Sequence, residues 1–180
     1  VDGSLIATCQ QAASAIADRR CGLFLVVIGD TERPFVKTEF VDESEIGSLS
    51  TMFGDQSLSQ VLQEQSVGFL QTTTKDLKTY AEPILPPPRL LIIGGGHVGQ
   101  ALAVQANLTG FELVVFDDRP NFTSAELFPA GTQRFCGDIE TQLNHFPIDH
   151  DCYIVIVTRD HRHDAEALAA CLPSPAKYLG

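Results

Sequence analysis

The chain has few basic residues. Its 12 lysines and arginines stand against 23 acidic residues, which gives a formal net charge of −11. Binding nucleic acid without sequence preference requires a basic surface, so we expect no nucleic-acid partner. A surplus of surface carboxylates is typical of a protein that remains dissolved in the cytoplasm.

Long apolar runs and a leader segment are also missing. The longest apolar runs, such as 23–28, are strand-sized, whereas a bilayer-spanning helix needs about 20 apolar residues. The opening VDGSLIATCQ lacks the basic segment followed by an apolar one that marks a signal peptide. We therefore expect a cytoplasmic protein with no membrane partner. Because the chain opens with valine rather than methionine, we expect a fragment or a processed form.

Common signatures of metal sites and hydrolases are absent. The cysteine count, five, is odd and no C-x-x-C occurs, which argues against a disulfide framework or a structural zinc site. Reduced thiols are the simplest interpretation, and we expect no bound metal. The sequence also contains neither G-x-S-x-G nor the G-K-[ST] of a P-loop.

Prolines divide the chain into two parts. Three consecutive prolines end the segment 83–88, which we interpret as a semi-rigid linker. Residues 1–82 are predicted to form a small α+β domain. There the patterns favour helices at 4–20, capped by Ser4 and stopped by Gly22, and at 57–65, with strands at 23–28, 34–41, 67–73 and 76–82.

Residues 89–180 alternate between apolar strands and amphipathic helices. Strands are predicted at 89–94, 112–117, 132–136, 152–158 and 176–179, and helical segments at 97–109, 124–128, 139–146 and 164–171. This alternation predicts an α/β domain with a Rossmann-like parallel sheet covered by helices on both faces.

A glycine turn follows the first of these strands. Gly94, Gly96 and Gly99 occupy the G-x-G-x-x-G positions of a dinucleotide-binding turn. In such a turn the backbone approaches a pyrophosphate, and the N–H groups at the helix start face the phosphates. We therefore predict a cofactor-binding segment whose other members are Gly95, His97 and Val98.

Acidic residues end the second strand. Asp117 stands where a carboxylate accepts hydrogen bonds from a ribose diol, which favours an NAD-like ligand. Arg119 instead suits a 2′-phosphate, as in NADP. Asp118 is either solvated or caps the next turn. After the third strand, Asp138 either contacts a ligand or, as we favour, caps the helix that begins at Ile139.

The loop after the fourth strand is dense in titratable groups. Thr158, Arg159, His161 and Asp164 are expected on the same rim as the glycine turn. Arg159 or Arg162 could hold a phosphate or a pterin-like anion. His161, His163 and Asp164 could bind a metal or transfer protons, although polarity without a metal is the favoured interpretation. Asp164 is also placed to cap the last helix.

Several of these motifs together resemble one family. PPPRLLIIGGGHVGQALA, VVFDDRPNF, the following GD, IVTRDHRHDAEAL and AKYLG are similar to the carboxyl-terminal Rossmann domain of the XdhC/CoxI family, the xanthine dehydrogenase accessory proteins. The resemblance covers about 86–180. It implies a chaperone that binds the molybdenum cofactor and helps to deliver its sulfurated form to a molybdenum hydroxylase such as xanthine dehydrogenase, rather than an enzyme.

The resemblance also sets limits. The family's G-S-I-S-G-G-C-like stretch does not occur here, so its cofactor-linked cysteine has no counterpart on this chain. The family sheet continues past the position of Gly180, so the Rossmann domain is expected to be truncated at its end. A sheet with an open edge would suit a homodimer. Two alternatives stay open: an NAD(P)-dependent oxidoreductase, or a regulatory interaction module without a ligand.

Overall fold

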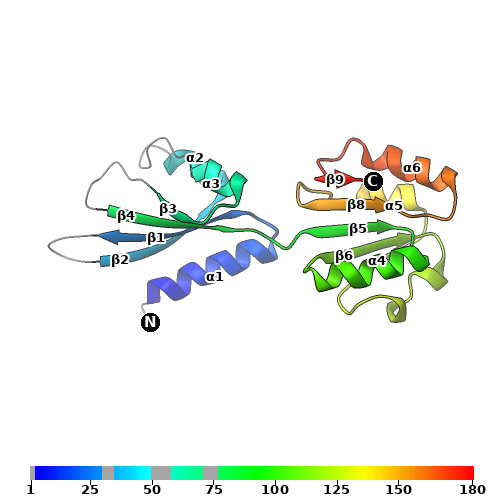
Figure 1. The fold of residues 1–180 in the computed structure, drawn as a ribbon, viewed down its shortest axis with the longest axis horizontal. Coiled ribbons are helices and arrows are strands. Elements are labelled where there is room, and N and C mark those ends of the chain that lie inside the picture. The colour runs from blue at the N-terminus through cyan, green and yellow to red at the C-terminus, as the bar shows by residue number, and fades with distance from the viewer. Residues whose placement is uncertain (1–2, 30–34, 50–57, 71–76) are drawn as a thin grey trace. The chain divides into compact units, whose positions relative to one another are not determined.

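The computed structural model describes residues 3–29, 35–49, 58–70 and 77–180. The chain divides into two compact units, Val1–Pro86 and Pro87–Gly180 (Figure 1). Each unit has its own buried core and is described by itself.

The amino-terminal unit contains a four-stranded antiparallel sheet in the order β2-β1-β4-β3. Leu23 and Leu25 lie two residues apart on the same face of β1, and they are buried with Val61 and Leu62 of a helix. The opposite face is covered by a second helix, whose buried residues include Ala12 (Figure 1). The elements are α1 (Gly3–Ala17), β1 (Gly22–Gly29), β2 (Phe35–Asp42), the 3-10 turn η1 (Glu43–Glu45), α2 (Ile46–Leu49), α3 (Leu58–Glu64), β3 (Gly68–Leu70) and β4 (Leu77–Ile84).

Two boundary predictions in this unit were wrong. Helix α1 begins at Gly3 and ends at Ala17, so Ser4 lies in its first turn and does not cap it. The helix stops because Arg19 adopts a left-handed backbone, with φ +55°, and Gly22 already belongs to β1. Residues 34, 57, 71–73 and 76 of the predicted elements lie outside the described residues.

The predicted linker is shorter in the structure. Pro83 pairs with Leu23 and Ile84 with Gly22, so the first two residues of 83–88 are part of β4. A proline is tolerated in a strand that has a free side, and β3 pairs with β4 only as far as Ala81.

The carboxyl-terminal unit contains a five-stranded parallel sheet in the order β7-β6-β5-β8-β9. All five residues of β5 are buried because helices cover both faces of the sheet. Strands β6 and β8 lie on either side of β5, so the chain reverses direction across the sheet between β5 and β8, and open α/β sheets bind ligands at such a point. The elements are β5 (Arg89–Ile93), α4 (His97–Leu108), β6 (Glu112–Asp117), the 3-10 turns η3 (Pro120–Phe122) and η4 (Ala125–Leu127), β7 (Gln133–Cys136), α5 (Ile139–His145), β8 (Cys152–Ile156), α6 (His161–Cys171) and β9 (Tyr178–Leu179).

The side chains of the sheet alternate between two cores. Ile92 and Val115 pack with Ala103 of α4. Ile93 and Phe116 point the other way, into the core shared with α5 and α6. The predicted fold class is therefore confirmed: a Rossmann-like parallel sheet with helices on both faces, preceded by a smaller α+β part.

The start of the last helix differs from the prediction. Helix α6 begins at His161, three residues earlier than expected, because Asp160 accepts hydrogen bonds from the N–H groups of Arg162 and His163 and caps the helix. Asp164 therefore lies inside the first turn.

In the described ranges, helices fall short of the length and apolarity needed to cross a bilayer.

Candidate functional site at the glycine turn

The glycine turn connects β5 to α4 at the carboxyl ends of the strands. Gly94 and Gly99 of this turn are required by packing. Gly94 has φ +116°, and a Cβ there would lie 2.4 Å from the carbonyl oxygen of Val157. A Cβ on Gly99 would lie 2.0 Å from the Gly94 carbonyl oxygen. Larger residues at these positions would push β5, α4 and the loop after β8 apart.

Gly96 is different because the space in front of it is open. Its φ of −66° suits any residue, and a Cβ there would meet no atom of the described residues within 4 Å. Gly96 is the N-cap of the 12-residue helix α4 and, as a glycine, supplies no side-chain cap to this helix end. His97 and Val98 of the first turn are exposed. The helix start therefore offers backbone N–H groups and a positive dipole end to an anion.

Asp117 is buried, with 2% of its side chain exposed. Its Oδ2 accepts the N–H of Gly95 at 2.8 Å and Nη2 of Arg119 at 2.9 Å. Its Oδ1 accepts the backbone N–H and the Nε of Arg119, both at 2.9 Å. Burial alone would raise the pKa of Asp117, but the hydrogen bonds from Arg119 and Gly95 outweigh it, and the pKa lies below its usual value.

Arg119 also contacts the segment that follows it. Its guanidinium carbon lies 3.8 Å from the centre of the Phe122 ring. The Phe122 carbonyl lies against Gly95, where a Cβ would be 2.1 Å from the oxygen. Turn η3 thus covers the Gly95 side of the glycine turn and leaves the Gly96 side open.

Asp118 joins two loops at the rim. Its Oδ2 accepts a hydrogen bond at 2.9 Å from Nη2 of Arg159, which follows β8. Because β6 and β8 flank β5, this ion pair crosses above the end of β5 where the glycine turn begins. Arg159 is 48% exposed, so its charge is also open to solvent. The structure thus brings Arg159 and Asp118 together, as expected for residues of one rim.

The other rim residues mostly hold local structure. The hydroxyl of Thr158 donates to the Asp164 carboxylate. His163 Nδ1 lies 2.9 Å from Asp160, and His161 is fully exposed with its Nδ1 3.9 Å from Asp164. In the described parts of the chain, no three His, Cys, Asp or Glu side chains are grouped so as to hold a metal ion.

A cavity of about 490 Å³ lies between the starts of α5 and α6. Asp138 caps α5 by accepting the N–H of Thr141 at 2.9 Å, as favoured from the sequence, and this bonding to Thr141 lowers its pKa. Four carboxylates line the cavity against one arginine, which disfavours an anion. The lining residues are Asp118, Asp138, Ile139, Glu140, Arg162, His163 and Glu166.

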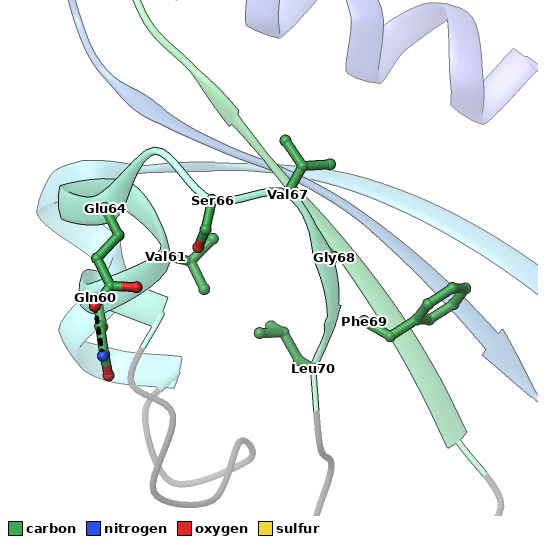
Figure 2. Close-up of a pocket in the computed structure, with 8 residues that line it drawn as sticks. All are labelled: Gln60, Val61, Glu64, Ser66, Val67, Gly68, Phe69 and Leu70. Atoms are coloured by element: carbon green, nitrogen blue, oxygen red, sulfur yellow. Dashed lines mark hydrogen bonds between the residues drawn. The ribbon is translucent and has the colours of Figure 1, made fainter.

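A second hollow of about 220 Å³ lies in the amino-terminal unit, between α3 and β3 (Figure 2). Val61 and Leu70 point into the space between helix and strand, whereas Phe69 turns away. The acidic residue of its lining, Glu64, accepts a hydrogen bond from Gln60 at 2.7 Å. This lining has few groups that could bind a ligand or take part in a reaction, so the glycine turn remains the candidate site.

Sequence reasoning missed two parts of the site. Phe122 packs on Arg119 and Gly95, a contact that depends on the path of η3 and has no signal in the sequence. Asp160 caps α6, and here a signal exists: an aspartate three residues before His163 at the start of an amphipathic run is typical of an N-cap.

Comparisons with known proteins find similarity that includes this part of the chain. The family model for the XdhC Rossmann domain matches residues 90–180. A Bacillus subtilis (strain 168) protein named as a probable xanthine dehydrogenase component is 32% identical over 113 residues, which cover 62% of this chain and 33% of that protein. The uncharacterized protein YqeB of Escherichia coli (strain K12) is 34% identical over 94 residues, which cover 52% of this chain and 17% of that protein.

A solved structure shares the fold. The crystal structure of a xanthine dehydrogenase from Bacillus halodurans superposes with a TM-score of 0.70 over 100% of this chain and 54% of that one, at 18% identity. The chain spans a third or less of the curated relatives named above and about half of this structure.

Proposed function

Because the chain belongs to the XdhC Rossmann domain family, we propose that it acts in an accessory protein for molybdenum hydroxylases of the xanthine dehydrogenase type. Its task would be to help the molybdenum cofactor to be bound, sulfurated or inserted into the enzyme. The name of the Bacillus subtilis relative associates that protein with xanthine dehydrogenase. The observation that carries the proposal is the glycine turn, which is open at Gly96 and lies on an uncapped helix start.

The residues of the turn fit the phosphate end of such a cofactor. The N–H groups at the start of α4 would bind phosphate oxygens. Because Gly96 has no side chain, these oxygens could approach the backbone closely. Arg159, on the same rim and half exposed, would add a positive charge. The cofactor supplies the hydroxylation chemistry of the client enzyme once it is delivered.

The rim favours binding over catalysis. Its acidic groups are engaged in holding the protein together: Asp138 and Asp160 cap helices, and Asp117 is enclosed by Arg119 and Gly95. A carboxylate that acts as a general base must be free beside the substrate. Engaged carboxylates instead fix the loops that would hold a ligand, which is what a carrier protein requires.

The test is Gly96→Asp in the full chain. An aspartate is a preferred N-cap and fits the φ of −66°, so the fold should be kept. Its carboxylate would occupy the free N–H groups and repel a phosphate. The matched control, Gln105→Glu, adds the same charge on an exposed position of the same helix. The variants are compared for retained pterin, by fluorescence after oxidation, and for capture of a xanthine dehydrogenase.

We expect the unaltered chain and the Gln105→Glu variant to retain pterin, and Gly96→Asp to lose at least about nine-tenths of it, the equivalent of about 1.4 kcal/mol in binding. Equal retention by all three would contradict a phosphate site at the turn. If the unaltered chain neither retains pterin nor captures the enzyme, the proposed function as a whole is contradicted.

A further inference from the structure

The carboxylate at the end of β6 has no free acceptor position. A carboxylate offers about four lone-pair sites on its two oxygens. Asp117 uses them for four N–H groups at 2.8–2.9 Å, three from Arg119 and one from Gly95. In a dinucleotide site, this carboxylate must instead face the ligand and accept hydrogen bonds from the ribose hydroxyls.

Arg119 is engaged as well. Two N–H groups on one edge of its guanidinium donate to Asp117, and one face stacks on Phe122. To turn this bound edge toward a 2′-phosphate, Arg119 would have to leave Asp117, which is 2% exposed and would remain as a buried charge without its cation. Removing one partner of a buried ion pair is strongly unfavourable.

The backbone of η3 closes the same place. The carbonyl of Phe122 lies so near Gly95 that a Cβ on this glycine would be 2.1 Å from the oxygen. Gly95 also donates its N–H to Asp117 and not outward. The ribose side of the turn is therefore covered, while the Gly96 side is open.

We propose that the Asp117–Arg119 pair determines the specificity of this site, because it prevents a ribose diol from binding at the end of β6. The turn then accepts the phosphate of a ligand that places no nucleoside there, and it discriminates against NAD and NADP. The exclusion of ribose follows from the contacts of Asp117 and Arg119. The identity of the favoured ligand, a pterin phosphate without a nucleotide extension, rests on the proposed function.

The test uses calorimetric titration of the full chain with NAD⁺, NADP⁺ and, as a probe without a nucleoside, inorganic pyrophosphate. The unaltered chain should bind neither dinucleotide more than about threefold more tightly than pyrophosphate, since the ribose adds no contact. Arg119→Ser frees two acceptor positions of Asp117 and removes the stacking contact with Phe122 of the covering turn η3, so NAD⁺ binding should strengthen at least about tenfold. The double variant Asp117→Asn, Arg119→Ser should lose that gain.

Circular dichroism establishes that each variant is folded. If Arg119→Ser fails to fold, Arg119→Lys replaces it, since lysine keeps a charge near Asp117 but not the fork of two N–H groups. Tight NAD⁺ binding by the unaltered chain that Asp117→Asn abolishes would overturn the proposal. So would a folded Arg119 variant with unchanged NAD⁺ affinity. Failure of the proposed function shows separately, as the absence of both pterin retention and enzyme capture by the unaltered chain.

Discussion

Replacing Asp117 by asparagine tests the role of the buried carboxylate at the glycine turn. Asparagine has nearly the same shape but one acceptor oxygen, and its amide nitrogen would face two of the four N–H donors that now bind Asp117. A hydrogen bond to a charged group contributes about 1.5–3 kcal/mol. Arg119 is 28% exposed and can regain water, so we take the lower value for two lost bonds and expect a loss of about 3 kcal/mol in the free energy of unfolding.

The assay is urea unfolding of the full chain followed by far-UV circular dichroism, because the sequence has no tryptophan to report by fluorescence. Hydrogen exchange in β5 and β6 assigns the loss to the carboxyl-terminal unit. The control is Asp118→Asn, since the Asp118–Arg159 pair is exposed on both sides, 34% and 48%, and should contribute under about 1 kcal/mol. A loss below about 0.5 kcal/mol for Asp117→Asn, or equal losses for both variants, would refute the reasoning.

Three further predictions follow from the same structure. Folding lowers the pKa of Asp117. The contribution of Asp117 to the free energy of unfolding is therefore complete above its unfolded pKa of about 3.9 and disappears as the pH falls toward its folded pKa. When stability is measured against pH, the unaltered chain should therefore lose stability more steeply below pH 4 than Asp117→Asn. Burial raises the pKa of Cys152 to about 11, so at pH 8 mass spectrometry should find it unmodified by iodoacetamide under conditions that modify the exposed Cys136; equal labelling would contradict the buried position. Gly99→Ala should cost at least about 3 kcal/mol in urea unfolding, because its Cβ would meet the turn's backbone, whereas Gly96→Ala should cost under about 1 kcal/mol; similar losses would contradict the packing described.

The fold of the carboxyl-terminal unit could be predicted because its signals are local. A strand buried on both faces must be apolar throughout, and 89–93 is apolar from its second residue onward. Each strand is followed by a helical pattern, and this alternation allows few topologies other than a parallel sheet. The motifs of this part also identified the family, which the comparison over residues 90–180 confirms.

The contacts that the site residues make were harder to predict, because these contacts depend on which loops come together. The sequence placed Asp117 at the correct strand end, yet nothing in it says that Arg119 folds back onto this carboxylate. The start of α6 was misplaced because Asp160 and Asp164 are both capping residue types, and only the backbone shows that Asp160 takes the position. In the amino-terminal unit, Arg19 ended a helix in a conformation that arginine adopts infrequently.

Native mass spectrometry of the full chain, purified from cells that make the molybdenum cofactor, would detect directly which ligand the glycine turn holds. We expect an added mass equal to a phosphate-bearing pterin on the unaltered chain and on Gln105→Glu, and none on Gly96→Asp. A nicotinamide dinucleotide on the unaltered chain, or a pterin whose retention is the same on all three, would contradict it.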